Sequence, residues 1–208
     1  MNIVLFGGAF NPPHIGHLIV IQQALELIQA DQLWLLPCFN HSFDKDLASP
    51  DHRLTMLELI IQELPKNLQK KVKICPIEID FKLSGQTHEA IFKLTNEEKY
   101  LKDKHLLPSN SSIENVKYSF LMGSDNLKDF EKWHQWQKLI KTINFYIYPR
   151  NGYTQEKLYL NMTLLKSDTQ VVTNFSSTIM RKRFKQNLSL KNFVPKSILK
   201  YLSAHSLY

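Results

Sequence analysis

The sequence contains little cysteine, with only Cys38 and Cys75 in a chain of 208 residues. The two lie far apart, each within an apolar run, and no zinc-ligand spacing joins them. A disulfide-dense fold and a cysteine-based metal centre are therefore excluded. Buried free thiols in a reducing compartment are the simplest account of both residues.

Several other signals are also absent. No apolar run is long enough to span a bilayer, and the opening MNIVLFGG lacks the basic leader and the length of a signal peptide. The Gly-Lys-Ser/Thr ending of a Walker phosphate loop does not occur. We therefore expect a cytoplasmic protein that has no membrane partner and does not hold phosphate through a Walker loop.

The composition is that of an ordinary globular protein, with 43% hydrophobic and 22% charged residues. The length predicts a single domain over residues 1–208. The net charge is +7, and much of the excess lies in residues 66–73 and 181–200, where no aromatic side chains interleave as in a base-stacking surface. We therefore expect no nucleic-acid partner.

Short apolar runs alternate with segments of helical periodicity along the whole chain. The predicted strands cover residues 2–6, 33–38, 72–79, 118–122 and 143–148, with 170–173 as a candidate sixth. The predicted helices cover residues 14–29, 50–64, 87–97, 127–141, 177–184 and 195–205, and 100–117 is predicted to be a surface loop. This order predicts an α/β, Rossmann-like, doubly wound parallel sheet of five to six strands, with helices on both faces and ligands at the carboxyl ends of the strands.

A glycine-rich turn joins the first strand to the first helix and ends in two histidines. Its chemistry-bearing residues are Gly7, Gly8, Ala9, Phe10, His14 and His17. Glycine lets backbone approach a ligand closely, and a helix N-terminus attracts phosphate. The three-residue spacing of His14 and His17 places them on one face of the first helical turn. A metal-binding pair and a purely structural pair stay open as alternatives, although no third metal ligand is evident.

A second polar segment lies near the other end of the chain. It reads Phe175-Ser176-Ser177-Thr178-Ile179-Met180-Arg181. The hydroxyls can cap a helix whose N-terminus faces phosphate, and Arg181 follows one turn later. The alternative interpretation is an ordinary serine cap on a basic helix.

The two segments together resemble the signatures of the HxGH nucleotidyltransferases, and most of the chain resembles the bacterial nicotinate-nucleotide adenylyltransferase family. The likeness includes His52-Arg53-Leu54-Thr55, Gly123-Ser124-Asp125-Asn126-Leu127, the Trp133–Trp136 segment and Tyr148-Pro149-Arg150. One region departs, because Gly85-Gln86-Thr87-His88-Glu89-Ala90 replaces the usual Ser-Tyr-Thr-x-Asp-Thr. This departure puts the acceptor in doubt more than the chemistry.

The resemblance implies direct attack of a pyridine mononucleotide on ATP, with pyrophosphate as leaving group and magnesium carried by ATP. It implies catalytic roles for His14, His17, Lys45 and Arg181. It implies that ATP contacts Gly7, Gly8, Ala9, Phe10, His14, His17, Phe175, Ser176, Ser177, Thr178 and Arg181. It implies that the mononucleotide contacts Thr87, Gly123, Asp125, Trp133 and Arg150. No protein-bound metal site is expected, and a homo-oligomer stays open.

Alternatives remain for the substrate and for single residues. The acceptor is expected to be nicotinate mononucleotide, with nicotinamide mononucleotide as the nearest alternative. A non-catalytic nucleotide- or RNA-binding protein is the competing class. Trp133 would stack on a pyridine ring or pack in an amphipathic helix, and Asp125 would bind ribose hydroxyls or cap a helix.

Overall fold

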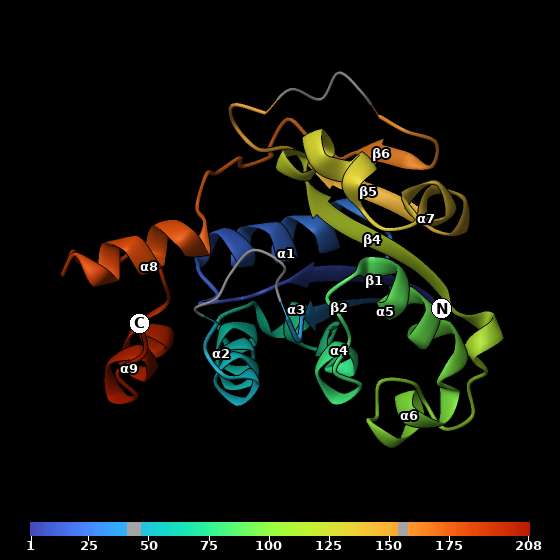
Figure 1. Ribbon diagram of the computed structural model, residues 1–208, viewed down its shortest axis with the longest axis horizontal. Coiled ribbons are helices and arrows are strands. Elements are labelled where there is room, and N and C mark those ends of the chain that lie inside the picture. The colour runs from blue at the N-terminus through green and yellow to red at the C-terminus, as the bar shows by residue number, and fades with distance from the viewer. Residues whose placement is uncertain (41–46, 154–157) are drawn as a thin grey trace.

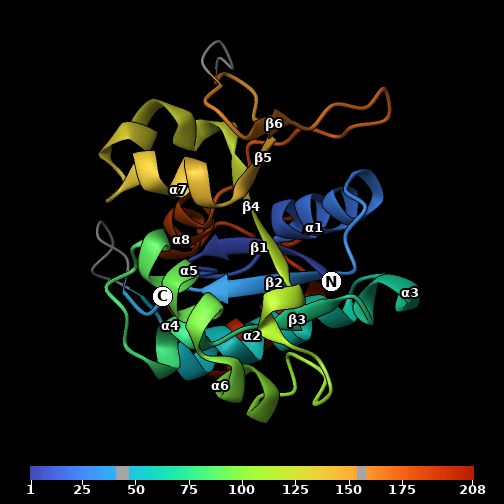
Figure 2. The same cartoon turned by 90° about the vertical axis from the view of Figure 1, so that its right-hand side faces the viewer.

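The computed structural model describes residues 1–40, 47–153 and 158–208. Within them the chain forms one sheet of six strands, which Figures 1 and 2 show in the interior of the molecule with helices around it. The strands are β1 (Asn2–Gly8), β2 (Gln32–Pro37), β3 (Val72–Ile74), β4 (Lys117–Gly123), β5 (Asn144–Tyr148) and β6 (Met162–Leu164).

The strands lie in the order β3-β2-β1-β4-β5-β6, and each neighbouring pair is parallel. The direction of winding reverses between β1 and β4, which places a crevice for ligands beyond their carboxyl ends. The predicted Rossmann-like, doubly wound sheet is confirmed.

The helices follow the strands in the expected alternation. They are α1 (Ile15–Leu27), α2 (Pro50–Gln62), α3 (Lys66–Gln69), α4 (Ile77–Asp80), α5 (Thr87–Asn96), α6 (Glu98–Asp103), α7 (Trp136–Thr142), α8 (Ser177–Lys185) and α9 (Lys196–Ala204). Two 3-10 helices, η1 (Ile113–Asn115) and η2 (Ser124–Lys132), flank β4. No helix in the described part of the chain is both long and apolar enough to cross a bilayer.

Alternation along the central strands builds a core on each face of the sheet. Ile3 and Leu5 of β1 join a cluster with α5 and α7, whereas Val4 between them joins a cluster with α1 and α2. Successive side chains of a strand point to opposite faces, so strands buried on both sides are continuously apolar. This explains why β1 and β2 are such clear strands in the sequence.

The last part of the chain forms a third cluster outside these two layers. Met180 of α8 packs with Ile198 and Leu202 of α9 and with Met56 of α2. Figure 1 shows α8 and α9 together at one end of the molecule, near α2. The second sequence motif is thereby brought back toward the start of the chain.

One predicted strand is wrong in its extent, and another is wrong altogether. The strand predicted over 72–79 ends at Ile74, and α4 follows, because Pro76 cannot donate a hydrogen bond to a sheet ladder. Residues 170–173 form no strand, and Val171 and Val172 are 50% and 40% exposed. The sixth strand is β6 instead, whose three residues are too few for periodicity to signal.

The helix predicted over 127–141 is also wrong in part. It is divided into η2 and α7, because Trp133 has extended backbone and Gln135 takes the left-handed conformation at φ 54°. Within 100–117, predicted as loop, the end of α6 and the whole of η1 are helical. The break after η2 accompanies the contact of the Trp133 ring with Phe120 of β4.

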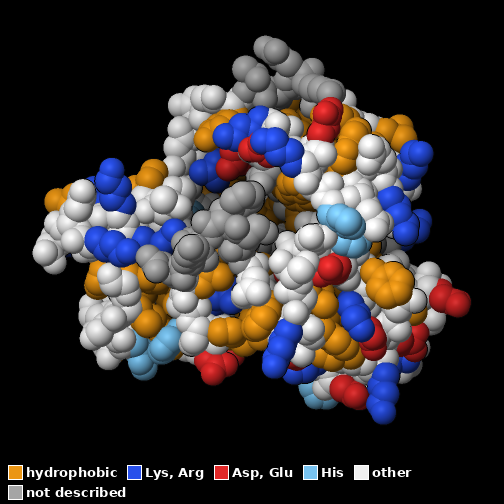
Figure 3. All heavy atoms as spheres, in the orientation of Figure 1, with side chains coloured by type: hydrophobic (Ala, Val, Ile, Leu, Met, Phe, Trp, Pro, Cys, Tyr) orange, Lys and Arg blue, Asp and Glu red, His pale blue; other side chains and the backbone are white. Residues whose placement is uncertain are grey.

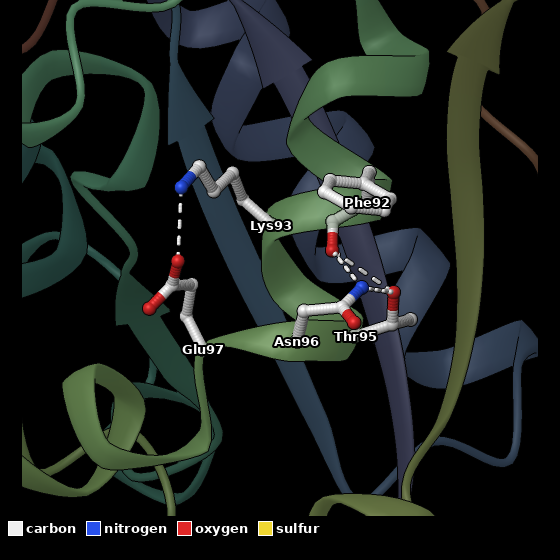
Figure 4. A network of polar contacts seen from close by, with 5 residues as sticks. All are labelled: Phe92, Lys93, Thr95, Asn96 and Glu97. Atoms are coloured by element: carbon white, nitrogen blue, oxygen red, sulfur yellow. Dashed lines mark hydrogen bonds and ion pairs between the residues drawn. The ribbon is translucent and has the colours of Figure 1, made fainter.

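Helix α5 is held at its carboxyl end by a local polar network (Figure 4). Lys93 and Glu97 form an ion pair at 2.9 Å, and the Asn96 amide donates to the Phe92 carbonyl at 2.7 Å. These side-chain contacts add to the backbone hydrogen bonds of the last helical turn. They stabilise the helix whose first residue is Thr87.

Candidate active site

A cavity of about 900 Å³ opens beyond the carboxyl ends of the central strands. Gly8 ends β1, Gly123 ends β4 and Tyr148 ends β5, and all three line it. Figure 3 shows hydrophobic side chains inside a hollow on this face, with charged side chains along its border. The cavity therefore lies at the point where the winding of the sheet reverses, as doubly wound folds predict.

The two histidines lie together at the start of α1, and both line the cavity. His14 is the N-cap and is 3% exposed, and its backbone N–H donates to Nδ1 of His17 at 3.1 Å. The ring centroids are 3.8 Å apart. The three-residue spacing thus places the two histidines on one face of the first helical turn, as predicted. His17 also accepts the backbone N–H of His14, the N-cap residue.

Burial keeps both imidazoles neutral. Burial and the nearby Arg150 cation lower the pKa of His17 to about 3, and burial followed by His17 and Arg150 holds the pKa of His14 well below its usual range. Because Nδ1 of His17 accepts a hydrogen bond, its proton lies on Nε2. His17 can therefore donate one hydrogen bond from Nε2. In the described residues Nδ1 of His14 is buried without a hydrogen-bond partner.

The turn before α1 leaves no room for a side chain at Gly16. A Cβ there would lie 2.8 Å from Cβ of Phe175 and 3.0 Å from the His14 ring. Phe10 is buried behind the turn, with its ring 5.1 Å from that of His17. Gly16 therefore lets Phe175 and the His14 ring approach closely. Phe10 packs against the ring of His17.

The second motif meets the first one directly. Oγ of Ser177 donates to the Pro12 carbonyl at 2.9 Å, although 165 positions separate the two residues. Ser176 caps α8 by accepting from the Ile179 N–H at 3.2 Å. Phe175, Ser176 and Ser177 line the cavity together with the histidines, so two helix N-termini border one space. Helix N-termini attract anions.

Arg150 supplies a positive charge to the same space. Its Nη2 donates to the Phe175 carbonyl at 2.7 Å, and its backbone N–H donates to Oγ of the buried Ser124 at 2.9 Å. Nε lies 3.7 Å from Oδ1 of Asp125. The family resemblance implies that Arg150 contacts the mononucleotide, and the structure brings it near His14 and His17 as well, where it lowers their pKa values.

Gly123 allows Asp125 and Arg150 to approach the end of β4. A Cβ at position 123 would lie 2.2 Å from Oδ1 of Asp125 and 2.9 Å from Cδ of Arg150. Asp125 is in the first turn of η2 and lines the cavity. Carboxylate oxygens in this position accept hydrogen bonds from hydroxyl groups of a ligand.

Thr87 and Trp133 line another part of the cavity wall. Trp133 is half-buried, and its ring contacts Phe130 and Phe120 at centroid distances of 5.2 and 6.1 Å. The perpendicular arrangement on Phe120 is a favourable edge-to-face contact. Trp133 is thus both packed against the core and part of the wall.

Four predicted site residues do not line the cavity in the described residues, namely Ala9, Phe10, Thr178 and Arg181. The Ala9 carbonyl accepts from Nη1 of Arg53, and Thr178 is exposed. Nη1 of Arg181 donates to the Asn11 carbonyl at 2.9 Å. Lys45 lies outside the described residues.

Sequence reasoning missed Glu78, a carboxyl that lines the cavity and is 6% exposed. Burial, followed by repulsion from Glu89, raises the pKa of Glu78 to about 7, although Arg53 and the Phe39 N–H act in the opposite direction. In the described residues its Oε2 has no hydrogen-bond partner. Nothing local distinguishes Glu78 from Asp80, so only the tertiary structure identifies it.

The fold and the cavity define a nucleotide-binding α/β protein of the doubly wound class, with its phosphate-attracting groups at helix N-termini. The chain belongs to the cytidylyltransferase-like family, whose sequence model matches residues 5–183. Both motifs lie within this match.

Full-length relatives are similar to this chain. A protein of Hydrogenobaculum sp. (strain Y04AAS1), named probable nicotinate-nucleotide adenylyltransferase, is 28% identical, with 100% of this chain and 98% of the relative covered. A protein of the same name from Salinibacter ruber is 26% identical, with 100% and 98% covered. The structure of Plasmodium falciparum nicotinic acid mononucleotide adenylyltransferase complexed with NaAD matches with a TM-score of 0.78 at 23% identity, with 100% and 97% covered. That structural likeness supports the fold.

Glu78→Gln tests the buried carboxyl through the pH dependence of stability. Because the folded-state pKa is raised to about 7 from 4.5, wild-type protein loses stability as pH rises from 4.5 to 7. The glutamine side chain does not ionise, so the variant does not lose stability in this way as pH rises. We expect its Tm, relative to wild type, to increase across that interval by roughly 5–10 °C and then to stay level. Thermal unfolding at pH 4.5, 6 and 8 measures this, and a pH-independent difference would contradict it.

Proposed function

We propose that this chain is a nicotinate-nucleotide adenylyltransferase, a nucleotidyltransferase of NAD biosynthesis acting as one domain over residues 1–208. It joins ATP and nicotinate mononucleotide to give deamido-NAD and pyrophosphate. The observation that carries the proposal is the meeting of the two motifs at one cavity, through the contact of Ser177 with Pro12. The full-length relatives support the same activity.

The reaction is a direct in-line displacement. An oxygen of the mononucleotide 5′-phosphate forms a bond to the α-phosphorus of ATP as the bond from that phosphorus to the β-phosphate bridging oxygen breaks. Pyrophosphate carries away the electron pair. No protein nucleophile is needed, so the chain contributes positioning and stabilisation of charge.

The neutral histidines suit this task. His17 donates from Nε2, and its neighbour His14 also lines the cavity, with Nδ1 buried and without a hydrogen-bond partner among the described residues. Together with Arg150 and the N-termini of α1 and α8, they direct donors and positive charge toward phosphate oxygens. Fixed donors in a buried site need no reorganisation when charge develops, and this is why they accelerate the displacement.

The mononucleotide is proposed to lie against the other wall. Trp133 would stack on the pyridine ring, Thr87 would donate to its substituent, and Asp125 beside Gly123 would accept from ribose hydroxyls. Lys45 and Thr178 remain sequence predictions for the triphosphate. Arg181 also remains a prediction for direct contact with pyrophosphate, and its guanidinium supports the Asn11 carbonyl.

Magnesium is proposed to arrive with ATP. In the described residues no group of three or more His, Cys, Asp or Glu side chains is placed to hold an ion. We expect the ion to be coordinated mainly by phosphate oxygens and water, which is the usual environment of magnesium. The ion would neutralise phosphate charge when bound.

Pyrophosphate release from ATP and magnesium tests the activity and its acceptor. We expect release with nicotinate mononucleotide to exceed release with nicotinamide mononucleotide in kcat/KM. Gln86 lines the cavity beside Thr87, and its amide can pair with a carboxylate or a carboxamide. Preference for the amide substrate would therefore keep the chemistry and change the acceptor, and no release with either would contradict the proposal.

Variants of His17 separate its two ring nitrogens. His17→Ala and His17→Asn remove the Nε2 donor, and we expect kcat to fall by about two to three orders of magnitude. The asparagine oxygen retains an acceptor near the Nδ1 position for the His14 N–H. His17→Gln retains a donor near Nε2 and is expected to lose less. A folded His17→Asn enzyme with nearly full kcat would refute the role of Nε2.

Trp133→Ala tests the proposed pyridine wall. Loss of a stacking surface worth about 1–3 kcal/mol should raise KM for the mononucleotide about tenfold or more and leave KM for ATP within twofold. Trp136→Ala is the matched control, because Trp136 also packs on Phe130 but does not line the cavity. Equal effects of Trp133→Ala on both substrates would show that Trp133 serves only the core.

A further inference from the structure

The turn that carries the histidines is held from behind by distant segments. Asn11 in its centre is 0% exposed, so its polar atoms depend on protein partners. Its Oδ1 accepts from the Ala48 N–H at 3.0 Å, and its carbonyl accepts from Arg181 at 2.9 Å. The backbone of Ile15, one residue past His14, donates to the Phe193 carbonyl at 3.0 Å.

Tyr208 adds a further contact to this buried asparagine. Its hydroxyl donates to Oδ1 of Asn11, across 197 positions of sequence. The Tyr208 ring packs against the cluster formed by α8 and α9, which also holds Phe175 of the cavity wall. The segment after α9 thus contacts the active-site turn through a hydrogen bond and packs against the same hydrophobic cluster as Phe175.

Buried Arg53 adds further hydrogen bonds near this contact. Arg53 is 0% exposed and donates to the carbonyls of Cys38 at 2.7 Å, Ala48 at 3.1 Å and Ala9 at 3.2 Å. It therefore ties the end of β2, the start of α2 and the turn to one another. The Tyr208 hydroxyl adds one more hydrogen bond to this set, on the side chain of Asn11.

We propose that Tyr208 is a positioning residue for the reaction, whose hydroxyl orients the His14–His17 turn through Asn11. Tyr208 is not among the described residues that line the cavity. Its action is on the geometry of the donors, and small displacements of positioned groups lower rates strongly. The effect on rate rests on the proposed adenylyltransferase function, whereas the effect on the turn does not.

Tyr208→Phe removes the hydroxyl and keeps the ring in its cluster. Because the turn then loses one of its hydrogen bonds while the ring stays packed, we expect kcat to fall about three- to tenfold. KM for the mononucleotide should stay within twofold. Tyr201→Phe is the matched control, because the hydroxyl of Tyr201 in α9 bonds to Nδ1 of His52 at 2.9 Å and is not part of the turn. Its kcat should stay within twofold of wild type.

A second measurement reports the tautomer of His17 in the turn and does not depend on catalysis. The ¹⁵N shifts of the His17 ring should show a single Nε2–H tautomer in wild type and in Tyr201→Phe, and a mixture of tautomers in Tyr208→Phe. Unchanged His17 signals and unchanged kcat in Tyr208→Phe would overturn the proposal, as would equal losses in both variants. Inactivity of wild type with every pyridine mononucleotide would refute the proposed function alone, since the ring signals would still test the turn.

Discussion

The hydrogen bond from the His14 backbone N–H to Nδ1 of His17 is the contact on which the site depends. It caps α1 and sets the protonated nitrogen of His17, because an accepting Nδ1 leaves the proton on Nε2. Burial beside Arg150 keeps both rings neutral, so the site presents oriented donors rather than mobile charges. The surrounding framework serves to keep this short turn in one conformation.

That framework is drawn from nearly the whole length of the chain. Strand β1 delivers the turn to the point where the sheet reverses, and Ser177 of α8 closes on it from the other side. Arg53 and Tyr208 hold it from behind. The family model, which matches residues 5–183, includes Arg53 and Ser177 of this framework, whereas Tyr208 lies beyond the match.

Most of the fold could be predicted because its strands are buried on both faces. β1 and β2 are continuous apolar runs between turn signals, and such runs are recognisable without any partner. β3 and β6 have three residues each, and Trp133 lies where a regular helical pattern continues although the helix is broken. In these places tertiary packing overrides the local preference of the sequence. The periodicity of apolar residues does not reveal such effects.

By itself the sequence determined the alternation of strands and helices, the glycine turn with its paired histidines, and the hydroxyl-rich cap before α8. These features depend on spacing between near neighbours, which a linear sequence carries. Only the tertiary structure decided that Arg150 lies near the histidines, that Glu78 is a buried acid in the cavity wall, and that Tyr208 reaches Asn11. Those properties arise from desolvation and from contacts across the chain, and both exist only after folding.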